Sequence, residues 1–191
     1  LEDVIFRLMR DYGQEEAARR NRIALIGLRG AGKTTLGRRL ATDLGFRFIE
    51  LDAEIERDTG MPMGEIFALY GQSGYRRIEQ RCLRRALDSG EHTVLATGGG
   101  IVSQTETYDL LLSRCLTIWL RTSPEEHMQR VSAQGDLRPM AGSAEAMEDL
   151  RRILAAREPH YMRADHVVDT TGQSEEDSFR ALRNAVVDRG G

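Results

Sequence analysis

The sequence is poor in cysteine and in long apolar runs, and both shortages narrow its class. Its two cysteines, Cys82 and Cys115, lie far apart without the spacing of a metal site, so we expect two buried thiols rather than a disulfide. No apolar run approaches the roughly 18 residues that cross a membrane, and the chain does not show a secretory signal. We therefore expect a cytoplasmic protein with no membrane partner.

An excess of charge of one sign is also missing. The formal net charge is −3, which provides no overall basic field to attract nucleic acid or a membrane surface. Hydrophobic residues make up 40% of the chain and charged residues 30%, as in ordinary globular proteins. A chain of 191 residues is long enough to bury a hydrophobic core without disulfides or bound metals to stabilise it, and we expect one main domain.

Lysine occurs once, at position 33, whereas all other basic residues are arginine. Lys33 lies in the stretch 27–34 (GLRGAGKT), which matches the phosphate-binding pattern G-x-x-x-x-G-K-[ST] between a strand-like run and a helical pattern. Backbone N–H groups of such a loop surround a polyphosphate, and a slim ammonium fits where a guanidinium is too bulky. The alternative is a glycine-rich turn without a ligand. We predict a nucleotide site formed by Gly27, Gly30, Ala31, Gly32, Lys33, Thr34 and Thr35, with the Thr34 hydroxyl on Mg²⁺.

Strand-like runs alternate with helical patterns along the chain. The apolar runs are 23–27, 46–51, 93–97, 116–120 and 166–169. Helical patterns run from the phosphate loop to a stop at Gly45, over 73–88 with Ser73 as a cap, from the capping sequence SPEE at 123–126, and over 145–163 and 174–188. This alternation predicts a three-layer α/β fold, with a five-stranded parallel sheet covered by helices on both faces.

The first twenty residues differ from the rest. Ile5, Leu8, Met9 and Tyr12 could line one helical face before Gly13 interrupts it, and a polar connector follows. A helix leading out of another domain and an N-terminal helix packed on the body both fit this pattern. Because the first residue is not Met, we expect 1–20 to be a linker from a missing upstream domain and 21–191 to be the main domain.

Two acidic residues follow the second apolar run. Glu50 and Asp52 are two apart, so in a strand they point the same way, towards the ligand crevice at the carboxyl end of a parallel sheet. One carboxylate could hold Mg²⁺ through water, and the other could accept a proton from a hydroxyl nucleophile. The alternative is that Asp52 only caps the next helix.

Two glycine-rich stretches complete the candidate site. Gly98, Gly99 and Gly100 follow a buried strand, which indicates a close approach of backbone to a ligand or to other backbone. The alternative is a tight structural turn. The stretch 133–146 lacks periodicity and is expected to be a mobile loop. Arg138 within it could close over the phosphates as a lid arginine, or the stretch could be an ordinary surface loop.

These elements, in this order, resemble the shikimate kinase family over about residues 22–190. The resemblance implies a P-loop kinase fold of the nucleoside-monophosphate-kinase type that binds ATP and Mg²⁺ at 27–34. It implies that Asp52 holds acceptor hydroxyls and is a candidate base, while Gly98 to Gly100 line the acceptor pocket. It further implies that Arg76 and Arg157 bind the shikimate carboxylate, that Arg138 stabilises the transferring phosphoryl group, and that Asp169, Thr170 and Arg130 contact the nucleotide. Glu50 departs from the family, which usually has aspartate there as a magnesium contact.

Four segments are also similar to the C-terminal domain of the benzoyl-CoA-responsive regulators of aromatic catabolism: RIALIGLRGAGKTTLG, WLRTSPEEHM, AQGDLRPMAG and AMEDLRRILAAREPHY. Those regulators join a helix-turn-helix domain to a shikimate-kinase-like domain. This resemblance implies an effector-sensing domain that could form a homodimer and touches DNA only through a missing N-terminal domain. We take the sensor as the main interpretation and an active shikimate kinase as the alternative. A kinase of another small hydroxylated acid is a third hypothesis.

Overall fold

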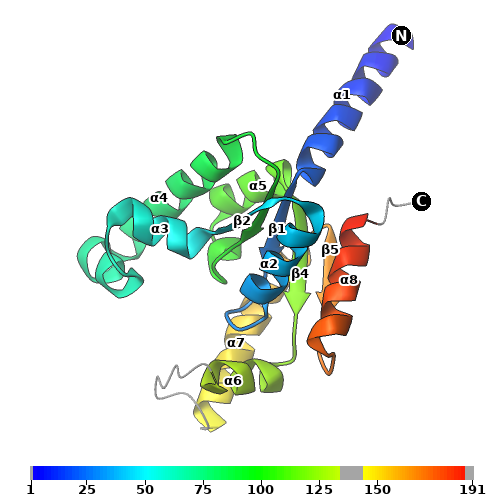
Figure 1. Ribbon diagram of the computed structural model, residues 1–191. Helices are drawn as coiled ribbons and strands as arrows, with labels where there is room; N and C mark the ends of the chain where they lie inside the picture. Colours follow the sequence, from blue (N-terminus) through cyan, green and yellow to red (C-terminus); the bar gives the residue numbers. More distant parts are fainter. Residues whose placement is uncertain (1, 134–143, 188–191) are drawn as a thin grey trace.

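The fold is built on a five-stranded parallel sheet, seen in a computed structural model that describes residues 2–133 and 144–187 (Figure 1). The strands are ordered β2-β3-β1-β4-β5. Their bounds are β1 (Arg22–Ile26), β2 (Arg47–Glu50), β3 (Thr93–Ala96), β4 (Leu116–Arg121) and β5 (His166–Asp169). All five expected strands are confirmed, and so is the α/β fold with a sheet between helices.

Consecutive residues of the central strand β1 face opposite layers of the molecule. Ala24 and Ile26 belong to one hydrophobic cluster, whereas Ile23 and Leu25 belong to the other. All four side chains are fully buried. Both faces of the sheet are therefore covered, which explains why β1 is a continuous apolar run rather than an alternating one.

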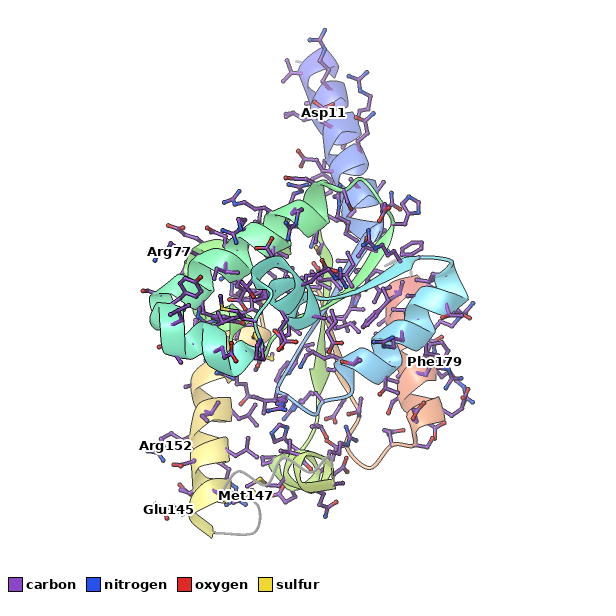
Figure 2. All side chains as sticks on the ribbon, turned by 60° about the vertical axis from the view of Figure 1, so that its left-hand side comes forward. Asp11, Arg77, Glu145, Met147, Arg152 and Phe179 are labelled. Atoms are coloured by element: carbon purple, nitrogen blue, oxygen red, sulfur yellow. The ribbon has the colours of Figure 1, made fainter. Side chains whose placement is uncertain are left out.

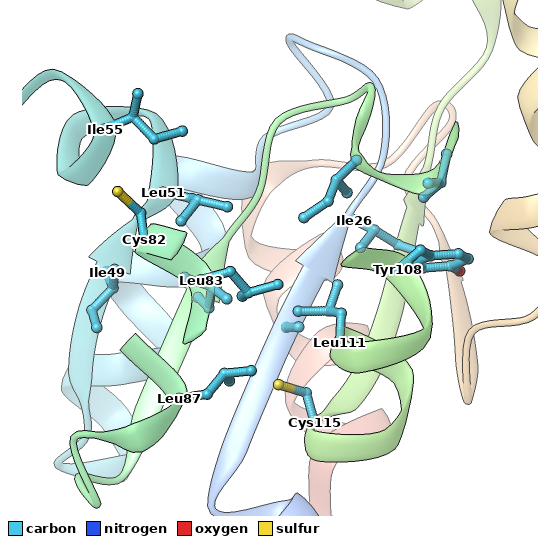
Figure 3. Close-up of a cluster of buried hydrophobic side chains, with 14 of the residues drawn as sticks. Ile26, Ile49, Leu51, Ile55, Cys82, Leu83, Leu87, Tyr108, Leu111 and Cys115 are labelled. Atoms are coloured by element: carbon cyan, nitrogen blue, oxygen red, sulfur yellow. The ribbon is translucent and has the colours of Figure 1, made fainter. Parts of the chain in front are cut away.

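The larger cluster lies between the sheet and four helices, α3 (Leu51–Thr59), α4 (Met63–Asp88), α5 (Thr105–Arg114) and α7 (Ala144–Tyr161). A short 3-10 helix, η1 (Ile101–Ser103), leads from β3 into α5. Figure 3 shows how Ile26 of β1, Leu83 of α4 and Leu111 of α5 meet in this layer. Cys82 and Cys115 are free and buried in the same cluster, as predicted.

The second cluster lies on the opposite face, under α2 (Lys33–Leu44) and α8 (Glu175–Val187). Leu36 and Leu40, one turn apart on α2, pack with Phe179 and Leu182 of α8. Phe179 is labelled in Figure 2. Its ring also lies under the guanidinium of Arg39, 3.9 Å from the ring centre. These contacts fix α2, and therefore the phosphate loop before it, against the sheet.

The helix ends follow the expected signals in two places and depart from them in one. Gly45 ends α2 in the left-handed conformation at φ 68°, and Ser123 caps α6 (Pro124–Ala133) by accepting the Glu126 N–H at 3.3 Å. The prediction that Ser73 caps a helix is wrong. The chain is already helical from Met63, and Gly71 (φ 64°, ψ −176°) makes only a kink within α4. Helix α5 was not predicted from the sequence, and a helix at the place of α3 was considered only in the alternative that Asp52 is a cap.

Helix α1 (Glu2–Arg20) extends away from the body (Figure 1). It continues through Gly13, so the predicted interruption is wrong, because one glycine inside a helix costs only about 1 kcal/mol. The side chains of Leu8 and Tyr12 are 63% and 71% exposed, so the N-terminal part of α1 does not pack on the body of the protein. The other end is held where Arg19 bonds to Asp165 at 2.7 Å.

Most of the expected lid at 133–146, Arg138 included, lies outside the described residues. Ala133 ends α6, and 144–146 form the first turn of α7. None of the described helices is long and apolar enough to cross a membrane.

Candidate functional site

A cleft of about 680 Å³ opens at the carboxyl ends of β1, β2 and β3. This is where ligands bind in open parallel sheets. Nine of the predicted site residues line it: Gly30, Gly32, Lys33, Thr34, Thr35, Glu50, Asp52, Gly98 and Gly99.

The phosphate loop at 27–34 runs from β1 to α2 in a conformation that depends on its glycines. Gly27 has φ 144°, and a Cβ there would lie 2.6 Å from the Leu120 carbonyl oxygen. Gly32 precedes the first residue of α2 at φ 91°, which side chains rarely tolerate. The loop therefore delivers the N-terminus of a packed helix, with its partial positive charge, to the cleft.

Lys33 lies at the base of the loop and is 8% exposed. Its Nζ donates to the carbonyl oxygens of Gly27 at 2.8 Å and Leu28 at 2.7 Å. Burial lowers its pKa to about 8, although the carboxylates of Asp52 and Glu50 oppose that shift. The ammonium is thus held at the place where it would pair with the phosphate oxygens of a polyphosphate bound in the loop.

The donor set for magnesium fits that ion. Thr34 Oγ1 lies 2.8 Å from Glu50 Oε1, so a hydroxyl and a carboxylate oxygen meet directly beside the loop. Within residues 2–133 and 144–187, no cluster of three or more His, Cys, Asp or Glu could hold a metal alone. Mg²⁺ is usually bound by one or two carboxylates together with phosphate oxygens and water, so this small set is what a nucleotide-dependent site requires.

Asp52 lies in a different element from the one expected. β2 ends at Glu50, so Asp52 stands in the first turn of α3, and the prediction that the two carboxylates share a strand is wrong. The alternative of a simple cap is not found either, because the residue at the cap position is Glu50. Both carboxylates nevertheless line the cleft, since the strand turns directly into the helix at its mouth.

The environment of Asp52 suits a proton acceptor. Its Oδ1 is buried and has no hydrogen-bond partner within the described part of the chain. Burial raises the pKa of the carboxyl, and Glu50 and Glu56 raise it further, while Lys33 and Arg29 oppose the shift. An unsatisfied, more basic carboxylate oxygen at a cleft is available to a hydroxyl donor.

The glycine triplet allows three polar groups to approach the backbone. A Cβ would lie 3.3 Å from Asp52 Oδ1 at Gly98, 3.5 Å from Arg157 Nη1 at Gly99, and 3.0 Å from Arg76 Nη2 at Gly100. At Gly100 the same position is 3.6 Å from Arg157 Nη2, so two guanidinium groups converge there. Two like charges this close favour a bound anion. A Cβ at Gly99 would also lie 3.3 Å from the Gly27 carbonyl oxygen, so backbone approaches backbone here, as one form of the prediction expects. The approach of this backbone to a ligand stays a prediction.

Glu79 and Tyr75 were not predicted from the sequence, and Glu79 holds the Arg76 guanidinium in place. Glu79 is 0% exposed and accepts hydrogen bonds from Arg76 Nη1 and the Tyr75 hydroxyl, both at 3.0 Å. Burial raises the pKa of Glu79, and its two donors oppose that shift. The i,i+3 spacing of Arg76 and Glu79 on a helix was the available signal. Seven residues of the cleft lining were also not predicted: Arg29, Ala53, Glu56, Met63, Phe67, Ala96 and Thr97.

Five predicted nucleotide residues lie outside the cleft lining: Gly27, described above, and Ala31, Arg130, Asp169 and Thr170. The Ala31 side chain is buried in the core under α2, and its amide donates to the Leu28 carbonyl at 3.2 Å. Arg130 lies on α6, with its Cβ 3.9 Å from the Cβ position of Gly30. Asp169 and Thr170 lie where β5 ends.

Comparison with known proteins identifies the family. The sequence pattern of the family described as "Shikimate kinase" matches residues 29–187. The chain belongs to the shikimate kinase family. It is 38% identical over 170 residues to the shikimate kinase of Symbiobacterium thermophilum, covering 88% of this chain and 97% of that protein. The enzyme of Nitrobacter winogradskyi is 44% identical over 146 residues, covering 76% and 67%.

Solved structures of shikimate kinases share the fold. The enzyme of Acinetobacter baumannii in complex with shikimate has a TM-score of 0.77 and 34% identity, covering 87% of this chain and 92% of that one. The enzyme of Bacteroides thetaiotaomicron has a TM-score of 0.78 and 30% identity, covering 85% and 96%. Shikimate kinases use ATP and Mg²⁺, which confirms the cofactors expected from the phosphate loop.

Proposed function

We propose that this chain is a kinase that transfers the γ-phosphoryl group of ATP to a hydroxyl of shikimate. The observation that carries the proposal is the placement of one carboxylate and two guanidinium groups around three successive glycines. Together these groups would meet a carboxylate and a hydroxyl of one small acid that bears both. The relatives of this chain are shikimate kinases, which supports the kinase over the sensor that was our main interpretation from the sequence.

The acceptor is oriented from both ends. Arg76 and Arg157 bind its carboxylate, and Glu79 keeps Arg76 in place through their 3.0 Å pair. The opposite end of the acceptor then places its hydroxyls at Asp52, whose Oδ1 lacks a partner among residues 2–133 and 144–187. A molecule without a carboxylate would not offer these two guanidinium groups an anion to bind.

The transfer step follows from this placement. Asp52 accepts the proton of the acceptor hydroxyl while the oxygen of that hydroxyl bonds to the γ-phosphorus of ATP. The bond between that phosphorus and the β–γ bridging oxygen breaks, and ADP leaves. Lys33 and the loop amides stabilise the negative charge on the phosphate oxygens. When bound, Mg²⁺ supplies further charge neutralisation at the phosphates, and Thr34 and Glu50 are the residues that would hold it.

A coupled assay with ATP, Mg²⁺ and either shikimate or its methyl ester tests the proposal. We expect turnover of about 1 s⁻¹ or more with shikimate. The methyl ester keeps every hydroxyl but removes the charge that the two arginines recognise, so kcat/KM should fall by about 100-fold, the equivalent of roughly 3 kcal/mol. Absence of turnover with shikimate, or equal turnover with both compounds, would show that the acceptor is wrong.

One observation favours a second candidate, the effector-sensing domain of a transcriptional regulator. Helix α1 extends from the body with Leu8, Met9 and Tyr12 exposed, while Arg19 fixes its other end to Asp165. A rigid helix of this kind suits transmission of a ligand-dependent change to another domain. Calorimetry with benzoyl-CoA tests it: saturable binding supports the sensor, and the absence of heat at high micromolar ligand counts against it.

A further inference from the structure

Glu126 on α6 contacts a part of the chain that lies 46 residues further along. Its Oε1 accepts the backbone N–H of Gly172 at 2.6 Å, and its Oε2 accepts Arg130 Nη2 at 3.1 Å. The Thr122 hydroxyl makes a longer contact with Oε2, at 3.4 Å. One carboxylate therefore fixes the distance between the Arg130 guanidinium and the turn after β5.

Arg130 also borders the phosphate loop. A Cβ at Gly30 would lie 3.1 Å from Val131 Cγ2, 3.7 Å from His127 Nδ1 and 3.9 Å from Arg130 Cβ. Helix α6 is thus packed directly on the loop. His127 is 8% exposed, and its Nδ1 has no hydrogen-bond partner in the described ranges.

The turn after β5 is ordered by its own hydrogen bonds. Both the amide and the hydroxyl of Thr170 donate to the Arg121 carbonyl, at 2.9 and 3.1 Å. The Asp169 carboxylate accepts the Thr171 N–H at 2.9 Å. Gly172 then adopts φ 68°, which presents its amide to Glu126. The turn is therefore held in one conformation by hydrogen bonds of its own backbone and side chains.

The order of the strands determines which end of a bound nucleotide lies near the turn after β5. The phosphate loop follows β1 at the centre of the sheet, and the acceptor residues follow β2 and β3 on one side of it. α6 and the turn at 169–173 follow β4 and β5 on the other side. Since the γ-phosphate must face the acceptor, the base and sugar must extend towards β4 and β5.

We propose that Glu126 is a positioning residue for the nucleotide base. By holding Arg130 against the turn at 169–173, it sets the width of a slot in which a flat base lies on the guanidinium plane. Without the carboxylate, Arg130 loses its counter-ion and the Gly172 amide loses its acceptor, so the slot opens. This inference rests on the proposed function only in requiring that the loop bind ADP.

Binding of ADP and of pyrophosphate, each with Mg²⁺, separates a base slot from the phosphate loop. For Glu126→Ala we expect the Kd for ADP to rise about tenfold, the equivalent of one modest interaction, and the Kd for pyrophosphate to stay unchanged. Glu126→Gln keeps an acceptor for the Gly172 amide and should show about a threefold rise. Glu125→Ala is the matched control, because this neighbour on the same helix instead pairs with Arg151 at 2.9 Å on the surface.

Each result decides the matter. An unchanged Kd for ADP in Glu126→Ala would overturn the inference. An equal rise in the Kd values for ADP and pyrophosphate would also overturn it, because a residue that only stabilises the fold would weaken the binding of both ligands to the same extent. If the wild type binds ADP but does not phosphorylate shikimate, the proposed function is wrong and this inference still stands on the binding data. If the wild type does not bind ADP, both are overturned.

Discussion

Lys33 shows how strongly a single position can be constrained. Its ammonium lies between two carbonyl oxygens of the loop that it serves, at 2.7 and 2.8 Å. A guanidinium would need more width than this nest provides. That constraint accounts for the presence of one lysine in a chain whose other basic residues are all arginine.

At the acceptor end, Gly100 is the residue with the least room. A Cβ there would lie 3.0 Å from Arg76 Nη2, and Glu79 restrains that guanidinium from moving away. We expect Gly100→Ala to raise the KM for shikimate about tenfold, through the loss of roughly 1.4 kcal/mol of binding, and to leave the KM for ATP unchanged. Gly64→Ala, with no atom within 4 Å of its Cβ position in the described structure, is the control. Equal changes in both KM values would contradict the assignment.

His127 predicts how stability depends on pH. Burial, followed by the charges of Lys33 and Arg130, lowers its pKa to about 4, whereas an unfolded histidine has a pKa of about 6.5. The unfolded state therefore binds more protons at His127 than the folded state does. As the pH falls from 7 to 5, this difference lowers the free energy of unfolding by about 2 kcal/mol. His127→Gln should lose correspondingly less in urea denaturation at the two pH values. The exposed His160→Gln is the control, and parallel pH profiles of wild type and His127→Gln would contradict the account.

Among the elements, helix α1 is attached to the body through Asp165. Asp165 accepts Arg19 Nη2 at 2.7 Å and both the N–H and the hydroxyl of Thr117, at 2.8 and 2.9 Å. Burial alone would raise the pKa of Asp165, but these donors outweigh it and hold the pKa below its usual value. The end of α1 is therefore fixed to β4 and to the segment before β5.

Asp165→Asn should weaken this attachment. The carboxylate accepts four hydrogen bonds, and its replacement should lower the free energy of unfolding by about 1–2 kcal/mol at pH 7. Because the folded pKa is depressed, the stabilisation is present above about pH 4 and is lost as the pH falls through the lower folded value. Urea denaturation at pH 7 and pH 3 measures this. Asp109→Asn, which breaks an exposed pair with Arg163, should change little, and an equal loss in both variants would contradict the account.

Several element-level predictions failed for physical reasons. α3 begins one residue after β2 ends, so no turn residue marks the boundary, and Asp52 was placed in the strand. Gly13 did not end α1, because one glycine within a long helical stretch is only a small cost. The strands were predictable, since buried parallel strands are short continuous apolar runs in any context.

At the scale of the whole molecule, the order of strands assembles the site. The phosphate loop could be predicted from the sequence, because its motif is local and its chemistry dictates the residues. The convergence of Arg76, Arg157 and Gly100 could not, because it joins α4, α7 and the end of β3 across the sheet. Without the structure, those residues could be proposed only through the family resemblance.

The rate of ADP formation with shikimate, compared between the wild type and Asp52→Asn, tests the central claim most directly. The claim is that one buried carboxylate receives the acceptor proton beside the phosphate loop. We predict that Asp52→Asn reduces kcat by at least about 100-fold while the Kd for ADP stays unchanged, because asparagine keeps the shape but cannot take the proton. Full activity in Asp52→Asn would contradict the account.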